Sequence, residues 1–574
     1  MEYSSLDKRL IWRMRTLIAG LSCVWLILAA RLVDLQWFHQ ADYARTAHQQ
    51  RLYVEDIRAR PGEIMDRDGR LLAMTVSTRS LFINPKCLTS PGQTAQKLAA
   101  ALGEDPDRLT VHFQKHSGKQ FLWVKRRLTD EQVRRVRGLQ LPGDVWGFRD
   151  EYLRQYPQGH LAAHVLGLRD IDGHGRGGVE QSFDRRIRGV DGKRVMDRDA
   201  RGHVLRVRDE VHAMPVDGRS VRLTIDSVIQ LFTERELDDV METWKPRSCT
   251  AIVLDPRSGE ILAMASRPGF DPNQPKVVLD HAWNNTALGA VFEPGSTLKP
   301  CIVAWALEQD LLRTGESLDC ENGEYRMGRR ILHDHHPFGR LSIEDILVKS
   351  SNIGMAKIGE RLGNDGLYRS ITRFGFGQRT GIELDEELRG LVRPLKQWNA
   401  YSTGSVPMGQ EIAVTPLQLL VAHAALANGG TLIRPRLVMN SQSSAGQSVD
   451  RVSTFCVKPE VANWVVRTAM QGVVDRGTGR KARISGVNIF GKTGTAQKID
   501  PQTGRYASDR HVCSFVCGAP AEEPRMMVLL VVDEPTVGPP HFGGTVAAPS
   551  ASRILERALG CASITNAPLR TANR

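Results

Sequence analysis

Two side chains near the middle of the chain have the types and the spacing needed for acyl transfer. Ser296 and Lys299 lie three residues apart in Glu-Pro-Gly-Ser-Thr-Leu-Lys, at the start of an apolar stretch. On a helix, residues three apart share a face about one turn apart, so the lysine amine can reach the serine oxygen. Because serine is a poor nucleophile unless a base takes its proton, this pair could form a serine acyl-enzyme.

Pro300 limits where this helix can begin. Proline fits only the first turn of a helix and disfavours helical geometry in the residue before it. We therefore expect the helix to begin at or very near Ser296. Its positive end would favour an alkoxide on that serine, and the apolar residues after Lys299 predict that the helix is surrounded by protein.

Two later motifs contain partners for the serine and the lysine. Ser350-Ser-Asn352 follows a predicted helix, and Lys492-Thr-Gly-Thr495 lies on a strand that we expect to begin at Val487. A serine and a lysine three apart arise by chance about twice in a chain of this length. The order S-x-x-K, S-x-N, K-T-G is much more specific, and it is the set found in penicillin-recognising enzymes.

Each residue also has an ordinary interpretation when it is taken alone. Lys299 could be a solvated helix lysine, and Ser350 could be a helix cap or a core hydroxyl. Thr493 and Thr495 could be ordinary strand residues. The order of the motifs favours a functional role for these threonines and for five other residues, which are Ser296, Lys299, Ser350, Asn352 and Lys492.

The composition restricts the class of protein. A chain of 574 residues has room for about two to four domains, and 25% charged with 41% hydrophobic residues is typical of a globular protein. The net charge of +13 indicates an anionic partner. Zinc-finger spacings, a Walker loop and aromatic-rich basic stretches are absent from the sequence, which disfavours nucleic acid. The nine cysteines form no CxxC pair, so we assign neither a metal site nor a disulfide.

A basic segment, residues 1–16, precedes an apolar segment at residues 17–38. The uncharged core of the second segment is shorter than a full membrane span, but Arg31 can extend toward the interface and Trp37 can lie in it. A cleaved signal peptide and a buried core helix are the alternatives. We expect a retained anchor, with the N-terminus in the cytoplasm by the positive-inside rule and the remainder outside.

Composition and patterning divide the rest of the chain into two domains. We expect a mixed α/β pedestal at 39–245, a catalytic domain at 246–562 and a flexible tail at 563–574. Strands near Thr250–Ala265 and after Val487, with helices between them, predict an α+β fold whose sheet takes strands from both ends of the catalytic domain.

Taken together, these residues resemble a class B penicillin-binding protein, a membrane-anchored peptidoglycan transpeptidase, over nearly the whole chain. The pedestal motifs that are similar are Arg60-Pro-Gly with Asp66-Arg-Asp-Gly69, Arg154 with Tyr156-Pro-Gln-Gly159, and Gly178-Val-Glu180. The catalytic motifs that are similar are Glu293 to Lys299, Val414-Thr-Pro-Leu-Gln418 and Gly491-Lys-Thr-Gly-Thr-Ala496. The S-S-N triplet, Phe374-Gly-Phe-Gly377 and Gly477-Thr-Gly479 resemble the cell-division type more than the elongation type.

The resemblance implies an antiparallel sheet flanked by helices, as in serine β-lactamases, and a role for each residue. Ser296 would attack a D-Ala-D-Ala bond. Lys299 would be the base, with its pKa lowered by burial and by neighbouring cations, of which Lys492 is the expected one. Ser350 would relay the proton and Asn352 would orient the lysine and the substrate. The substrate would be held by Thr493, Gly494 and Thr495, and the oxyanion by the backbone N–H groups of Ser296 and Thr495.

The resemblance also implies partners. These are peptidoglycan stem peptides and their lipid-linked precursor, the cell membrane, a polytopic glycosyltransferase with other cell-division proteins, and β-lactams as covalent inhibitors. No cofactor, metal or nucleic acid is expected. The catalytic domain would lie in the periplasm, on a single-pass protein of the inner membrane.

Four alternatives remain open at this point. The first is an elongation-type transpeptidase, and the second is a membrane-anchored serine β-lactamase, which has to hydrolyse its acyl-enzyme quickly. The third is a scaffold or β-lactam sensor that only binds. The fourth concerns Asp334-His-His-Pro337, which is expected to be a structural loop and could instead be a metal cluster.

Overall fold

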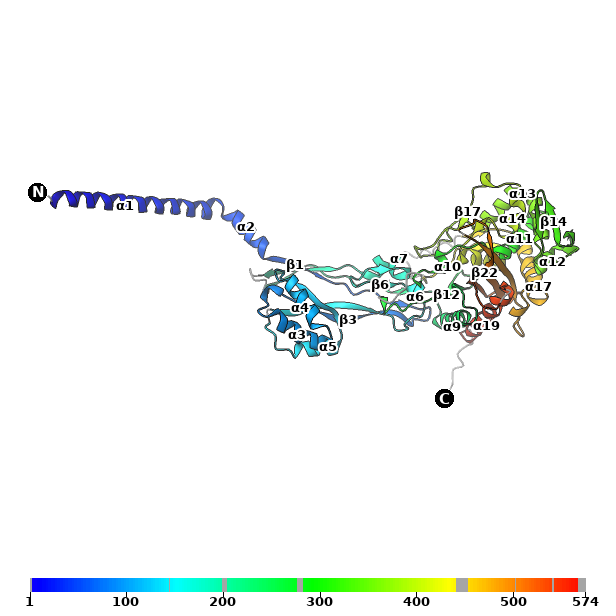
Figure 1. Ribbon diagram of the computed structural model, residues 1–574, viewed down its shortest axis with the longest axis horizontal. Coiled ribbons are helices and arrows are strands. Elements are labelled where there is room, and N and C mark those ends of the chain that lie inside the picture. The colour runs from blue at the N-terminus through cyan, green and yellow to red at the C-terminus, as the bar shows by residue number, and fades with distance from the viewer. Residues whose placement is uncertain are drawn as a thin grey trace. The chain divides into compact units, whose positions relative to one another are not determined.

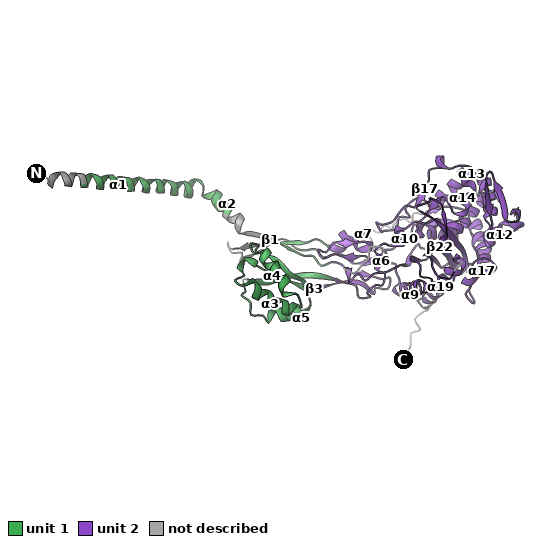
Figure 2. Cartoon of the chain, viewed as in Figure 1, with its two compact units in different colours: residues 1–60, 77–153, 189–217 green, residues 61–76, 154–188, 218–574 purple. Residues whose placement is uncertain are grey.

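A computed structural model describes residues 3–143, 145–198, 204–275, 282–439, 453–500, 502–538 and 541–565 (Figure 1). The chain divides into two compact units, which are coloured separately in Figure 2. Unit 1 comprises Met1–Arg60, Ser77–Leu153 and Gly189–Asp217, and unit 2 comprises Pro61–Val76, Arg154–Arg188 and Gly218–Arg574. The three motifs with candidate catalytic residues all belong to unit 2.

Unit 1 begins with a long apolar helix. Helix α1, Tyr3–Val33, continues into a π-helical turn, η1, at Asp34–Phe38, and α2 follows at Gln40–Arg51. Residues Leu10–Phe38 form the one helical stretch within the described ranges that is long and apolar enough to cross a membrane. None of it is buried within the structure, which disfavours the interpretation as a soluble core helix.

The rest of unit 1 combines two sets of strands with three helices. One antiparallel sheet has the order β1-β8-β9, with β1 at Leu52–Ile57, β8 at Gly192–Arg198 and β9 at Val204–Ala213. The long strand β3, Leu71–Ile83, belongs to unit 1 from Ser77 onward. It pairs with β4 at Leu122–Leu128 and with β5 at Trp146–Gln155, which belongs to unit 1 up to Leu153. The three helices are α3 at Pro91–Leu102, α4 at Pro106–Lys115 and α5 at Asp130–Arg137. Their apolar faces form a core with β3 and β4 around the fully buried Phe113.

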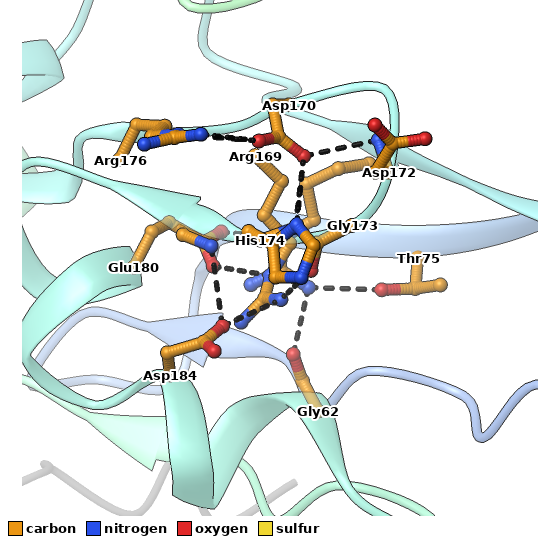
Figure 3. Close-up of polar contacts among 12 residues, drawn as sticks. Gly62, Thr75, Arg169, Asp170, Asp172, Gly173, His174, Arg176, Glu180 and Asp184 are labelled. Carbon is orange, nitrogen blue, oxygen red and sulfur yellow. Dashed lines mark hydrogen bonds and ion pairs between the residues drawn. The ribbon is translucent and has the colours of Figure 1, made fainter. Parts of the chain in front are cut away.

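Within unit 2, a buried ionic cluster joins the segments that contain the three pedestal motifs (Figure 3). The Glu180 carboxylate accepts from Nε of Arg154 and from Nε of Arg169, each at 2.6 Å. Nη1 of Arg154 also donates to the Gly62 carbonyl at 2.7 Å and to Oγ1 of Thr75 at 2.9 Å. The Glu180 side chain is 0% exposed and the two arginine side chains are 3% and 2% exposed. Buried charges are tolerated when each is paired in this way, so the cluster is architectural.

The main sheet of unit 2 takes its strands from both ends of the catalytic segment, as predicted. Its order is β12-β11-β23-β22-β21. The first hairpin is β11 at Ser248–Leu254 with β12 at Ile261–Arg267, and the later strands are β21 at Phe490–Ile499, β22 at Tyr506–Ala519 and β23 at Met526–Asp533. The strand with Lys492 therefore begins at Phe490 and not at Val487, which pairs instead with Ile484 in an isolated bridge.

Both faces of this sheet are covered. Successive apolar side chains of a strand point to opposite faces of the sheet, and each face packs in a separate core. Ala251 and Val253 of β11 pack in the core with α9, Ser227–Trp244, and α19, Ala548–Thr565 (Figure 1). Ile252 and Leu254 belong to the core on the opposite face, which is made largely by helices. The helices of that second core are α11 at Lys299–Glu308, α12 at Ile343–Lys349, α13 at Asn352–Arg373, α15 at Pro416–Ala427 and α16 at Pro459–Trp464. The predicted α+β class, with an antiparallel sheet flanked by helices, is confirmed.

Candidate active site

The turn that holds Ser296 depends on a glycine. Gly295 has φ 55°, a conformation that strains any residue with a Cβ. The 3-10 turn η5, Gly295–Leu298, contains Ser296 and leads into α11 at Lys299. The helical segment thus begins beside the serine, as predicted. Its first turn is 3-10 and the α-helix starts only at Lys299, because Pro300 fits only the first turn of α11.

The Lys299 amine lies among oxygen atoms of the Ser350–Asn352 motif. Nζ donates to the Ser350 carbonyl at 2.7 Å, to Oδ1 of Asn352 at 2.9 Å and to Oγ of Ser350 at 3.3 Å. The lysine side chain is 0% exposed. The Lys299 amine of α11 therefore connects the end of α12, at Ser350, to the start of α13, at Asn352.

The Ser350 hydroxyl lies between two amines. Nζ of Lys492 approaches its Oγ at 3.0 Å, and Nζ of Lys299 approaches it at 3.3 Å. Ser350 ends α12 with φ 61°, a left-handed conformation that is uncommon for a residue with a side chain. Such conformations persist where the surroundings enforce them and cluster at functional sites. The serine is thus held where a proton could pass between the two lysines.

Burial sets the protonation of the two lysines. Burial lowers the pKa of Lys299 to about 7, and the Asp334 carboxylate opposes this shift by favouring the charged amine. Burial and the charge of Lys299 lower the pKa of Lys492 well below its usual range. Burial therefore lowers the pKa of Lys299 as predicted, whereas the expected contribution of the Lys492 cation is not found. Burial and the charge of the neighbouring amine thus disfavour the state in which both lysines are charged.

Strand β21 presents its motif residues alternately to its two faces. Lys492 has the same parity as Phe490, whose ring lies in the core made with α11 and α13, so its amine is on the helical side. Thr493 and Thr495 have the opposite parity. Oγ1 of Thr493 is 2.7 Å from Oγ1 of Thr478, and Oγ1 of Thr495 accepts from the Gly543 N–H at 3.1 Å.

Thr478 was not among the predicted site residues. Its hydroxyl forms a pair with the Thr493 hydroxyl, so two threonines from different segments lie together at the rim of β21. The signal is present in the sequence, since Gly477-Thr-Gly479 is one of the motifs that resemble the cell-division type. Glycines precede and follow this threonine. An added Cβ at Gly477 would lie 2.4 Å from the Val348 carbonyl oxygen, so a side chain does not fit there without a shift.

The segment of Asp334 was predicted to be a structural loop. In the structure, Asp334 also contacts the motif that contains Ser350 and Asn352. Its carboxylate accepts from the hydroxyl of Ser351 at 2.7 Å, from the N–H of Ile353 at 3.1 Å and, closely, from the N–H of Asn352. A carboxylate at this position satisfies the free donors at the start of α13 and favours its positive end. Asp334 thereby fixes the orientation of the S-x-N motif. Among the residues that the structure describes, no group of three or more potential ligands that could hold a metal ion is found there or elsewhere.

Four of the five predicted catalytic residues are connected by hydrogen bonds, whereas the side chains of the predicted substrate-binding residues Thr493 and Thr495 bond to Thr478 and Gly543. Hydrogen bonds connect Lys299, Ser350, Asn352 and Lys492 directly. Ser296 is half-buried, and its hydroxyl takes part in none of the hydrogen bonds found within the described ranges. The arrangement provides a free serine hydroxyl one turn before a buried lysine of depressed pKa, which suits nucleophilic attack by serine with amine base catalysis.

Two protein families match the chain. The penicillin binding protein transpeptidase domain matches residues 249–556, and the penicillin-binding protein dimerisation domain matches residues 56–223. The first match covers the strands and helices that hold the three motifs, and the second covers most of the chain between the anchor and α9.

Named relatives span nearly the whole chain. The peptidoglycan D,D-transpeptidase FtsI of Escherichia coli is 30% identical over 571 residues, which is 98% of this chain and 94% of that protein. The probable peptidoglycan D,D-transpeptidase PenA of Neisseria meningitidis is 33% identical over 513 residues, 89% of this chain and 86% of that protein. The crystal structure of penicillin binding protein 3 from Mycobacterium tuberculosis with aztreonam is 28% identical with a TM-score of 0.69, and the match covers 89% of this chain and 98% of that one.

The motif order, the sheet with its two covered faces, the matched domains and these relatives agree. The chain therefore belongs to the class B penicillin-binding proteins, the monofunctional peptidoglycan transpeptidases, and within them to the septal type.

Proposed function

We propose that the chain is a peptidoglycan D,D-transpeptidase that cross-links stem peptides during septal wall synthesis through an acyl-enzyme on Ser296. One observation carries the assignment of residues. The Ser350 hydroxyl lies within hydrogen-bond distance of the amines of both Lys299 and Lys492, while Ser296 lies one turn before the first of these lysines. That geometry supplies a nucleophile, a base and a proton relay in one site.

The chemical step follows from these positions. The Ser296 oxygen attacks the carbonyl carbon of the D-Ala-D-Ala bond, and its proton passes to the neutral amine of Lys299. The C–N bond then breaks, and the leaving D-alanine amine receives a proton through Ser350. An amine of a second stem peptide then attacks the ester carbonyl, and the C–O bond to Ser296 breaks. The proton that the amine loses passes through Lys299 to the serine oxygen, which completes the cross-link.

Two backbone N–H groups stabilise the oxyanion in this proposal, those of Ser296 and Thr495. Supporting this, an added Cβ at Gly295 would lie 3.3 Å from the Thr495 carbonyl oxygen, so the two segments are in close contact. The substrate carboxylate binds at Thr493, Gly494 and Thr495, and the Thr478 hydroxyl beside Thr493 extends this polar rim. Asn352 orients Lys299 and the substrate backbone.

The acylation rate should follow the neutral fraction of Lys299. Its pKa is about 7, and only the neutral amine can accept a proton. We expect the acylation rate constant to fall about tenfold for each pH unit below 7 and to level off above it. The measurement is stopped-flow acylation by a penicillin between pH 5.5 and 8.5. A flat profile over this range would contradict a base role for Lys299.

The lifetime of the acyl-enzyme separates the transpeptidase from a β-lactamase. A transpeptidase should remain acylated by penicillin and should transfer the acyl group of a D-Ala-D-Ala peptide to an added amine. The test uses the purified full chain in detergent, with penicillin turnover and amine-dependent transfer both measured. Turnover of penicillin many times per minute, without transfer to the amine, would support the β-lactamase instead.

The setting of the enzyme is part of the same proposal. The chain is membrane-anchored, in keeping with the Leu10–Phe38 helix. We infer a single pass with a cytoplasmic tail at 1–16 and an anchor at 17–38, followed by a periplasmic pedestal at 39–245 and a transpeptidase domain at 246–562. Its partners are the lipid-linked precursor, a polytopic glycosyltransferase and other divisome proteins, and the positive charge suits anionic membrane and peptidoglycan surfaces.

A further inference from the structure

A buried histidine contacts the turn that holds the nucleophile. His423 lies on α15, of which residues 416 to 426 are all buried, and is itself 1% exposed. Its Nε2 is 2.8 Å from the Thr297 carbonyl oxygen. Thr297 is the residue directly after Ser296, and it lies within the 3-10 turn that precedes Lys299. A side chain of α15 is therefore bonded to the backbone between the two catalytic residues.

The chemistry of the contact fixes the form of the imidazole. A carbonyl oxygen can only accept, so Nε2 must have the proton and donate it. Burial lowers the pKa of His423 to about 4, so the ring is neutral and Nδ1 is unprotonated at neutral pH. Nδ1 is buried and has no hydrogen-bond partner among the described residues. Within the described part of the chain, the Nε2 contact with Thr297 is thus the one hydrogen bond of the ring.

Pro300 explains why the Thr297 carbonyl needs an outside donor. In a 3-10 turn the carbonyl of one residue accepts from the N–H three residues later. For Ser296 this donor exists, since the Lys299 N–H bonds to its carbonyl. For Thr297 the corresponding residue is Pro300, which has no N–H. The donor missing from the backbone is replaced by the imidazole of His423.

The Thr297 side chain connects this contact to the third motif. Its hydroxyl donates to the Pro294 carbonyl at 2.6 Å and closes the turn. Its methyl group packs against β21, where an added Cβ at Gly494 would lie 2.9 Å from it. A shift of Thr297 would therefore move Ser296 relative to both Lys299 and the K-T-G strand.

We propose that His423 is a positioning residue of the catalytic site, which holds Ser296 in register with Lys299 by donating from Nε2 to the Thr297 carbonyl. The inference rests on the proposed function, because it assumes that Ser296 is the nucleophile. An unrelated role in core packing would need the volume of the ring but not its N–H. The two roles differ in what they do to the acylation step.

The test compares His423→Leu with His423→Gln in the full-length protein. Leucine removes the donor, and glutamine places an amide N–H near the position of Nε2. With a chromogenic cephalosporin, His423→Leu should lower the acylation rate constant tenfold to a hundredfold, since small displacements of reacting groups have effects of this size. The noncovalent binding constant and the fraction of protein that becomes acylated should not change. His423→Gln should recover the rate to within about threefold of the unsubstituted protein.

A second substitution restores the donor from the backbone. In His423→Leu with Pro300→Ala, the new N–H at residue 300 can donate to the Thr297 carbonyl. The double variant should therefore acylate faster than His423→Leu alone, and this non-additivity measures the shared contact. Recovery of the rate by a backbone N–H cannot be explained by packing of the ring.

His164 is a matched control for burial. It is 6% exposed, its Nε2 is 2.9 Å from the Ala282 carbonyl, and burial lowers its pKa to about 4. His164→Leu should leave the acylation rate constant within about twofold of the unsubstituted protein, because Ala282 does not lie in the nucleophile turn. An equal loss in both leucine variants would overturn the proposal, as would an unchanged rate in His423→Leu.

Nitrogen NMR of histidine-labelled protein tests the proposal even if the leucine variants fail to fold. The resonances of His423 should show Nε2 protonated and Nδ1 unprotonated at pH 7. A proton on Nδ1 would overturn the assignment. If the unsubstituted protein were not acylated at Ser296, the proposed function would fail, and that result is distinguishable from any difference among the histidine variants.

Discussion

Replacing Ser296 by alanine is expected to abolish covalent labelling by penicillin and support of growth. In the proposed reaction the serine oxygen is the atom that forms the ester. Ser350 lies closest to the lysines, but its oxygen already contacts both amines. Loss of the nucleophile should leave no measurable acyl-enzyme, as judged by intact-protein mass spectrometry after incubation with penicillin.

The same variant should remain folded. The Ser296 hydroxyl is half-buried and makes none of the hydrogen bonds found in the described part of the chain, so its removal leaves no partner unsatisfied. We expect a change in unfolding free energy within about 0.5 kcal/mol. Ser258→Ala, in the turn between β11 and β12, is the control that should retain full labelling. Normal septation with Ser296→Ala as the sole copy would contradict an enzymatic role.

Replacing Glu180 by glutamine is expected to destabilise unit 2 strongly. The glutamine has nearly the same volume, so the change isolates the charge. It leaves the guanidinium groups of Arg154 and Arg169 buried without their common carboxylate. Breaking a buried pair by neutralising one partner costs about 3–5 kcal/mol. Denaturant unfolding of the purified protein, followed by fluorescence, should show the loss.

A surface ion pair provides the comparison for that result. Glu131 and Arg135 form an i,i+4 pair on α5 with side chains 62% and 55% exposed. Glu131→Gln should change the unfolding free energy by no more than about 0.5 kcal/mol. If Glu180→Gln had an effect as small as this, the cluster in Figure 3 would not be a structural support of unit 2.

The parts of the fold that the sequence predicted are those governed by local patterning. The continuous apolar runs of β11 and β23 predict strands whose two faces are both buried, and the sheet has both faces covered. The order of the three motifs identified the family without any knowledge of distances. Pro300 located the start of the nucleophile helix, although it could not show that the first turn would be 3-10.

The remainder of the site depends on contacts between residues far apart in the chain. His423 follows Thr297 by 126 residues, and nothing in its local sequence separates it from an ordinary core histidine. Asp334 acts through the start of α13, a contact between residues 18 positions apart in the chain. The pKa of Lys299 is lowered by burial, and the extent of burial follows from packing of the complete unit. A sequence motif therefore identifies the reacting groups, whereas tertiary structure determines their pKa values and their orientation.

The most direct test of the catalytic assignment is to locate the acylated residue. The full-length protein is labelled with penicillin and digested, and the modified peptide is sequenced by tandem mass spectrometry. We predict one adduct, on Ser296. An adduct on Ser350, or on any residue outside the turn Gly295–Leu298, would contradict the proposal that Ser296 is the nucleophile.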